Sequence, residues 1–272
     1  IYLTRDGGKT WSDVTPKGLA KFTKISSIDP SPHVDGVAYV AANRIKLDDN
    51  HPYLWKTSDF GAHWVQIQAT LPDTEPMRVL REDPGKRGLL FAGSERSVYF
   101  SNNDGHSWQS LALNLPLVPV RDLTFKNGDL IAATHGRGFY IMDNISSLEQ
   151  LSDKVVASDA HLFKPENQYR ETAGRGGFGG GGRGAGGRGV DPTRAVNPSG
   201  ENPASGIAVQ YWLKAPAKTV TLDCLDAKGT RSHRDATSPA LQPAAPQGGR
   251  GGGGRGGFVG GVARPANKAG VN

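Results

Sequence analysis

The chain has 272 residues, among them 37 glycines and 18 prolines, and only 36% of its residues are hydrophobic. A single cysteine, Cys224, excludes an intrachain disulfide, and the alternating residues around it predict a buried thiol. No apolar run reaches the roughly 18 residues that a membrane-spanning helix needs. The net charge of +6 is uneven, because residues 1–150 carry 16 basic and 17 acidic side chains and residues 151–272 carry 16 and 9. The first half is therefore nearly neutral, and the basic character belongs to the second.

Three segments of the first half repeat one pattern, which is Ser or Thr, any residue, Asp or Asn, any residue, Gly, two residues and Trp. The tryptophans recur at intervals of 53 and 44 residues, a period typical of solenoids and propellers. The segments are residues 4–11, 57–64 and 101–108, and their defining positions are Asp6, Gly8, Trp11, Asp59, Gly61, Trp64, Asn103, Gly105 and Trp108.

This pattern predicts a turn rather than a catalytic site. The Asp or Asn side chain can accept hydrogen bonds from nearby backbone N–H groups, and Gly can take a positive φ. The Trp then re-enters the sheet and packs against a neighbouring sheet. A catalytic group rarely recurs in every repeat, and one copy carries Asn103 in place of Asp.

Short apolar runs between turn residues predict four-stranded antiparallel units. No stretch shows a sustained apolar period of 3.6 residues, so the predicted fold class is all-β. The expected strands are residues 24–30, 36–42, 53–58 and 64–68, then 77–84, 89–93, 98–102 and 108–113, then 120–126, 129–134, 139–143 and a short run near Leu148.

These units amount to about three and a half blades, counting two strands around the first repeat. Closed propellers typically have four to eight blades. The sequence therefore predicts a fragment, truncated at both ends, of a longer propeller protein.

The repeats resemble the Asp-box, or BNR repeat, of the superfamily of sialidases, xyloglucanases and sortilin-type propellers, over residues 1–150. A fourth segment, residues 132–143, is similar to the closing blade of large exported bacterial BNR-repeat proteins described as glycosyl hydrolase-like. In that segment Phe139 replaces the Trp, and no Asp stands before the glycines. The resemblance implies an exported protein, secreted or periplasmic.

The second half contains two Gly-rich tracts, residues 174–189 and 248–261, whose composition cannot supply a core. They look like RGG boxes, but no folded nucleic-acid module accompanies them, so nucleic acid is not the expected partner. Alternation over residues 206–214 and 219–226 predicts a hairpin that resembles the opening of a fibronectin- or immunoglobulin-like sandwich. The expected organisation is a propeller part at 1–150, a linker at 151–204, and a partial sandwich at 205–272 interrupted by an insertion at about 236–264.

Candidate functional residues come from the loops on the face opposite the repeat turns, because loops on a rigid scaffold commonly carry function. Asp48, Asp49 and Glu95 are the candidate catalytic carboxylates, as glycoside hydrolysis uses a pair of them. Arginine can clamp a carboxylate or sulfate, and sialidases use an arginine triad in this way. The candidate binding residues of this rim are Arg44, His51, Arg96, His135 and Arg137. The nucleophilic Tyr and Glu partner of sialidases have no matching motif here, and Glu95 and Arg96 can also simply pair with each other.

Two functions remain open from the sequence. One is a glycosyl hydrolase-like or glycan-binding protein that acts on extracellular polysaccharides. The other is a non-catalytic, sortilin-like scaffold for extracellular proteins or peptides. No metal-ligand spacing, phosphate-binding loop or GxSxG motif is present, so no metal or other cofactor is predicted.

Overall fold

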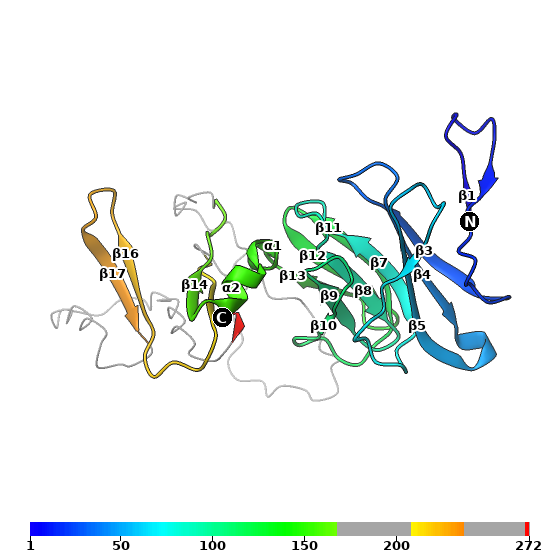
Figure 1. Cartoon of the computed structure of the whole chain (residues 1–272). Coiled ribbons are helices and arrows are strands. Elements are labelled where there is room, and N and C mark those ends of the chain that lie inside the picture. The colour runs from blue at the N-terminus through cyan, green and yellow to red at the C-terminus, as the bar shows by residue number, and fades with distance from the viewer. Residues whose placement is uncertain (168–207, 237–269, 272) are drawn as a thin grey trace, which may run out of the picture.

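The structure, a computed structural model, describes residues 1–167, 208–236 and 270–271 (Figure 1). The first 143 residues form four antiparallel sheets that follow one another along the chain. The first sheet pairs β1 (Tyr2–Leu3) with β2 (Ser12–Asp13). The next two have four strands each, β3 (Lys24–Pro30), β4 (Ala38–Arg44), β5 (Asp49–Thr57) and β6 (Val65–Gln66), then β7 (Met77–Glu82), β8 (Leu90–Ser94), β9 (Val98–Ser101) and β10 (Gln109–Ser110). The fourth has three strands, β11 (Val120–Lys126), β12 (Asp129–Thr134) and β13 (Phe139–Met142).

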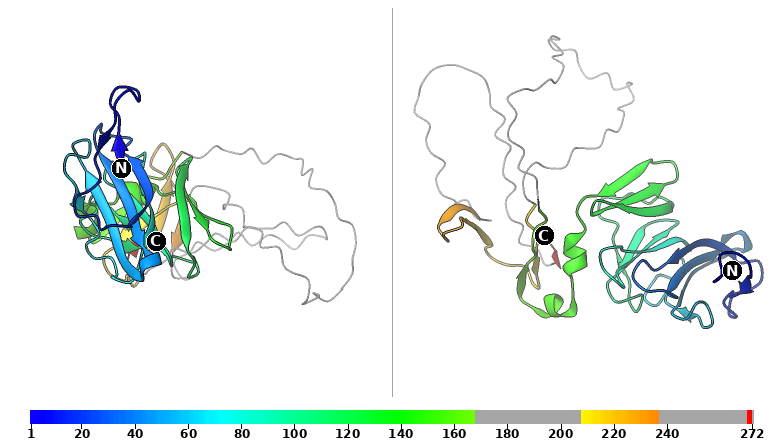
Figure 2. Two further views of the ribbon diagram at one scale, coloured as in Figure 1. Left: turned by 90° about the vertical axis from the view of Figure 1, so that its right-hand side faces the viewer. Right: turned by 90° about the horizontal axis from the view of Figure 1, so that it is seen from above.

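Within each of the last three sheets the strands lie in sequence order, so each sheet is an up-and-down meander. The first strands, β3, β7 and β11, lie side by side, and the sheets fan outward from them (Figures 1 and 2). This arrangement is that of consecutive propeller blades, and the predicted all-β class is confirmed. A short 3-10 helix, Ile45–Leu47, connects β4 to β5.

The core fills the spaces between the blades. One cluster joins the second and third sheets and includes Tyr39, Leu54, Leu80 and Trp108. A second joins the third and fourth sheets. All five residues of β8 are buried, because this central strand is covered on both faces.

The three repeat turns share one hydrogen-bond frame. In the second turn Thr57 Oγ1 accepts from Gly61 N at 2.9 Å, and Asp59 Oδ1 accepts from His63 N at 2.9 Å and from Thr57 Oγ1 at 2.9 Å. The first and third turns repeat these bonds through Thr4, Asp6, Ser101 and Asn103. The Asp and the Asn thus serve the same acceptor role, and the hydroxyl that begins each turn orients them.

Two of the turn tryptophans fasten one sheet to the sheet before it. Trp64 Nε1 donates to Val14 O at 2.7 Å, and Trp108 Nε1 donates to Ile67 O at 2.6 Å. The glycines of these two turns lie against the same neighbours, since a Cβ at Gly61 would lie 2.6 Å from the Val14 side chain and one at Gly105 would lie 2.8 Å from that of Ile67. Trp11 instead donates to Gly8 O of its own turn and is 59% exposed.

The fourth sheet departs from the repeat after its third strand. The predicted strand near Leu148 is wrong, because residues Ser146–Gln150 form helix α1. Asn144 has a positive φ of 56° and accepts from Ser146 N at 3.0 Å, which turns the chain into the helix. Helix α2 (Asp153–Ala157) follows, and both helices add residues to the core of the third and fourth sheets.

The hairpin predicted for residues 206–214 and 219–226 is wrong, because the strands in these two segments pair with other partners. Strand β15 (Tyr211–Leu213) pairs with β14 (Ala160–Leu162) and with β18 (Gly270–Val271). Strand β16 (Thr221–Leu225) pairs with β17 (Arg231–Ala236) in a separate sheet. The predicted burial of Cys224 is also wrong, because this residue is exposed.

The boundaries proposed for the linker and the sandwich stay a prediction. Strand β14 lies within the segment expected to be a linker, yet it shares a sheet with β15. Both Gly-rich tracts lie outside the described residues.

Candidate functional site on the inner strands and their rim

The two ends of the blades present different loops. We call the end that carries the repeat turns, together with the loops between first and second strands, the box face. We call the opposite end the rim face; it carries the loops between second and third strands and the loops that lead into β3, β7 and β11. All of the candidate binding and catalytic residues predicted from the sequence belong to the rim face.

The first strands of the second, third and fourth sheets, β3, β7 and β11, are the inner strands of the blades. Each inner strand carries a β-bulge at the same position near the rim face. The bulges fall between Ile25 and Ser27, between Met77 and Val79, and between Val120 and Asp122. A bulge leaves one residue unpaired and re-aims its side chain. The three bulged residues are Ser26, Arg78 and Arg121.

Two of these bulges supply arginines to Glu95. Arg78 Nε makes a short contact with Glu95 Oε1, and Arg121 Nη1 lies 3.6 Å from the same oxygen. Beside them Arg96 Nε lies 3.8 Å from Glu75 Oε1. Glu75 is buried and also accepts from Ser94 Oγ at 2.7 Å. The rim thus joins three arginines and two carboxylates across the third and fourth blades, and each of these carboxylates is already ion-paired.

A second group of rim residues surrounds Asp49. Arg44 Nε lies 2.8 Å from Asp49 Oδ2, and Tyr53 donates its hydroxyl to the same oxygen at 2.8 Å. Burial alone would raise the pKa of Asp49, but hydrogen bonds from Tyr53, the His51 N–H and Arg44 together lower it. Asp49 is therefore held as a carboxylate. Its neighbour Asp48 ends the 3-10 helix with a left-handed φ of 57°.

The remaining rim candidates are exposed. The His51 side chain is 66% exposed and lies 3.6 Å from Asp49 Oδ1. His135 and Arg137 stand in the tight turn between β12 and β13, where His135 N donates to Pro119 O at 2.9 Å. The structure thus brings Arg44 together with Asp49 and His51, and it leaves His135 and Arg137 on a turn of their own. The pairing of Glu95 with Arg96 considered from the sequence is wrong, because Glu95 pairs with Arg78 and Arg121 while Arg96 lies beside Glu75.

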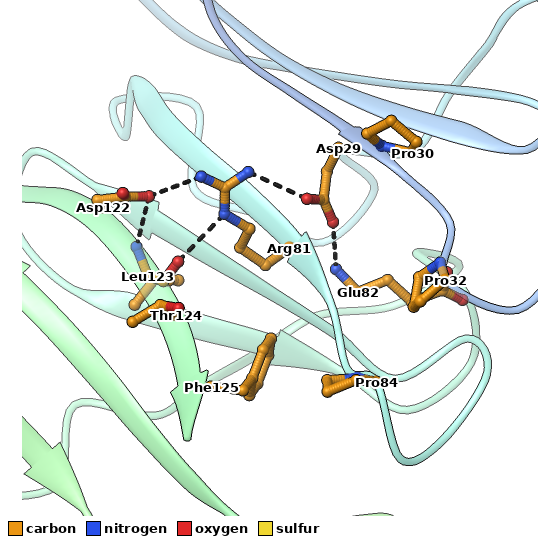
Figure 3. A pocket seen from close by; sticks show the side chains of 10 residues that line it. All are labelled: Asp29, Pro30, Pro32, Arg81, Glu82, Pro84, Asp122, Leu123, Thr124 and Phe125. Carbon is orange, nitrogen blue, oxygen red and sulfur yellow. Dashed lines mark hydrogen bonds and ion pairs between the residues drawn. The ribbon is translucent and has the colours of Figure 1, made fainter. Parts of the chain in front are cut away.

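The inner strands also hold an open pocket of about 360 Å³ toward the box face (Figure 3). Arg81 on β7 crosses its floor, with Nη1 3.0 Å from Asp29 Oδ1 on β3 and Nη2 2.9 Å from Asp122 Oδ1 on β11. Its Nε donates to Leu123 O at 3.1 Å, and Asp29 Oδ2 accepts from Glu82 N at 2.8 Å. Burial raises the pKa of Asp29 despite these partners. One guanidinium therefore joins three consecutive blades.

Sequence reasoning missed Arg78, Arg81 and Arg121, because it placed function in loops and these residues lie within strands. A signal was present, since Pro76-Met77-Arg78 and Pro119-Val120-Arg121 recur 43 residues apart, close to the spacing of the tryptophans.

The two faces differ in charge. Among residues 1–150 the rim face carries nine basic and five acidic side chains, whereas the box face carries seven basic and eleven acidic ones, with Asp13 assigned to neither. The rim residues are Lys17, Lys21, Lys24, Arg44, Lys46, Arg78, Arg96, Arg121 and Arg137, with Asp48, Asp49, Asp73, Glu75 and Glu95. A surface of one sign attracts ligands of the other, so the rim face favours anionic groups.

The repeated turns and the meandering sheets that they close define the class of this protein as a BNR-type β-propeller, as the sequence predicted. No family model matches the chain. It is 30% identical over 123 residues to vacuolar protein sorting/targeting protein 10 of Paracoccidioides brasiliensis, in strains Pb03 and Pb18 alike. The matched stretch is 41% of this chain and only 7% of those relatives.

Solved structures give weaker likenesses. A GH74 xyloglucanase from Xanthomonas campestris is 18% identical, with a TM-score of 0.41 over 53% of this chain and 24% of the other. YCF48 bound to D1 peptide is 20% identical, with a TM-score of 0.37 over 52% and 44%. The assignment of the fold rests on the sheets and turns described above.

Within the described parts of the chain, no helix is long and apolar enough to cross a membrane. The same residues contain no group of three or more His, Cys, Asp or Glu side chains that could hold a metal ion.

Proposed function

We propose that this propeller is a non-catalytic binding scaffold that captures acidic segments of other proteins on its rim face. The observation that carries the proposal is the state of the rim carboxylates. Glu95, Glu75 and Asp49 each have an arginine partner, while the rim as a whole retains a positive charge.

The same observation weighs against hydrolysis of a glycan. A glycoside hydrolase places two carboxyl groups on either side of the scissile bond, one as acid and one as base or nucleophile. Glu95 is held between Arg78 and Arg121, and Asp49 is held by Arg44. The hydrogen bonds that lower the pKa of Asp49 make this carboxylate a poor proton donor, because they favour its ionised form.

Protein ligands, rather than polysaccharides, are supported by the relatives named for vacuolar protein sorting and targeting. Because the matched stretch is a small part of those proteins, their role is transferred here only as part of the proposal. Export, secreted or periplasmic, is likewise proposed from the resemblance of the repeats.

The proposal is tested by fluorescence anisotropy with the whole chain and three labelled peptides of equal length, one rich in Glu, one with Gln at those positions and one rich in Lys. We expect the Glu peptide alone to bind. The double variant Arg96→Gln, Arg121→Gln should weaken binding about tenfold or more, because charge-assisted pairs are lost. The matched control is Arg87→Gln, an exposed arginine of the box face, which should leave affinity unchanged.

A parallel assay for release of reducing sugar from neutral and anionic polysaccharides decides between the two open functions. Turnover that disappears in Glu95→Gln would overturn the proposal in favour of a hydrolase. Tight binding of an anionic polysaccharide with no binding of the Glu peptide would overturn the choice of ligand.

A further inference from the structure

A hydrophobic groove lies between the third and fourth sheets, at the outer edge of the molecule. Its volume is about 70 Å³, smaller than the 360 Å³ of the open pocket on the inner strands. Residues that follow β10 form one wall, and β12 and β13 form the other. Its lining includes Val98, Leu111, Leu115, Leu130, Ala132 and Tyr140.

The strand registers show what this groove corresponds to in the preceding sheet. Ala92 pairs with Tyr99 as Ala132 pairs with Tyr140, and Ile67 N donates to Leu54 O as Leu111 N donates to Val98 O. The six lining residues therefore correspond, in order, to Leu54, Ile67, Leu71, Leu90, Ala92 and Tyr99. Those six belong to the hydrophobic cluster that encloses Trp108, which is only 6% exposed.

The groove thus repeats, one sheet further along, the site that Trp108 fills in the preceding sheet. No tryptophan of this chain fills the repeated site. All five tryptophans lie in the described residues, and none of them lines the groove. The cause is local, since the chain turns at Asn144 into α1 instead of returning as a fourth strand.

The polar groups that hold such a tryptophan are also repeated. Trp64 and Trp108 donate to the carbonyls of Val14 and Ile67, and Leu111 is the corresponding residue of the groove. Thr70 Oγ1 accepts from Trp108 N at 2.8 Å and donates to Trp108 O at 3.2 Å. The corresponding lining residue is Asn114, whose side-chain amide can also both accept and donate.

Beside the groove, β13 presents an open strand edge, because no described strand pairs with its outer side. In the third sheet Phe100 pairs with Gln109 of β10 and is 6% exposed. Its counterpart Ile141 is 58% exposed. An open edge of this kind is a template for an added strand.

We propose that the groove and the edge of β13 together bind an extended segment of another protein, which carries a tryptophan followed by two residues and an aliphatic residue. The indole fills the groove and donates to Leu111 O, and the residues after it pair with β13. The three copies of this pattern in the chain define the chemistry, namely Trp11-Ser12-Asp13-Val14, Trp64-Val65-Gln66-Ile67 and Trp108-Gln109-Ser110-Leu111. This site is separate from the cationic rim and does not depend on the function proposed for it.

The test uses the whole chain and a labelled synthetic peptide with the sequence of residues 104–112, titrated by fluorescence anisotropy. We expect saturable 1:1 binding, and we expect a peptide with Ala in place of its Trp to bind at least about tenfold more weakly. The variant Ile141→Pro should abolish binding, because it removes an N–H from the open edge and leaves the pairs with β12 in place. Its matched control is Ile141→Thr, which keeps that N–H and should bind like the parent chain.

A second variant, Ala112→Arg, introduces a charge into the lining of the groove and should also weaken binding, so the proposal does not depend on the folding of the proline variant alone. Three results would overturn it: no saturable binding up to about 1 mM peptide, equal affinity for the Trp and Ala peptides, or equal affinity of Ile141→Pro and Ile141→Thr. An oligomer of the chain that the peptide dissociates would also overturn it, because the groove would then belong to a second copy.

Discussion

Asp59 and Asn103 each accept one hydrogen bond from a backbone N–H and one from the hydroxyl that begins the turn, although one side chain is charged and the other is neutral. The pKa of Asp59 is lowered from 3.8 to about 2, chiefly by the hydrogen bond from His63 N and then by the His63 ring. The pKa of Asp6 is also lowered to about 2, chiefly by the Thr10 hydroxyl. The acid sensitivity of the turns therefore resides in Asp6 and Asp59.

The sign of this effect is fixed by the direction of the shift. A folded-state pKa below the unfolded one gives stability that is complete above about pH 5 and is lost as pH falls toward about 2. We expect the melting temperature of Asp59→Asn, measured from pH 2 to pH 5, to fall less at low pH than that of the parent chain. The double variant Asp6→Asn, Asp59→Asn should show a still smaller fall.

The control for this prediction is Asp73→Asn, because Asp73 is exposed and has no described hydrogen bond. It should follow the parent chain at every pH. Parallel loss of melting temperature in the parent chain and in Asp59→Asn would show that the turn carboxylates do not contribute.

At the scale of the element, the turns are fastened to the sheet before them by their tryptophans. Trp108 is buried and donates to Ile67 O, whereas Trp11 is 59% exposed and donates within its own turn. We expect Trp108→Ala to lower the free energy of unfolding by about 3–5 kcal/mol, because it removes the buried indole and leaves a cavity in the core. Trp11→Ala should cost less than about 1 kcal/mol, as for most surface changes.

Urea unfolding of both variants provides the measurement. Equal losses would mean that burial of the indole is not what stabilises the turn.

Elements that are determined by residues close in the sequence could be predicted, and elements that depend on contacts with residues far along the chain could not. The bounds of β3, β11 and β12 match the prediction, because alternation and turn residues are enough to define them. The helix at Leu148 was missed, since one short apolar run suits a helix or a strand equally. The pairing of β15 with β14 was missed because its partner lies about 50 residues away, across a Gly-rich tract.

The candidate site was predicted in part for the same reason. The loop residues Arg44, Asp49 and Glu95 could be placed on the rim from topology alone. Their partners Arg78 and Arg121 could not, since a β-bulge that turns a side chain toward the rim depends on strand register.

At the scale of the whole molecule, Arg81 joins three blades through Asp29 and Asp122. The Asp29 side chain is 17% exposed and that of Asp122 is 58% exposed, so the two ion pairs should differ in strength. We expect Arg81→Gln to cost about 1–3 kcal/mol, because it leaves Asp29 without its counter-charge. Asp122→Asn should cost under about 0.5 kcal/mol, as an exposed pair contributes little.

A double-mutant cycle of Arg81→Gln and Asp29→Asn, followed by urea unfolding, isolates the pair. The double variant should be more stable than the sum of the single losses predicts. Strict additivity would mean that Arg81 acts through packing alone.

The tryptophan bonds always run in one direction along the chain. Trp64 reaches back 50 residues and Trp108 reaches back 41, in each case to a sheet whose residues come earlier in the sequence. Each of these two indoles therefore docks on a surface whose residues leave the ribosome before it does.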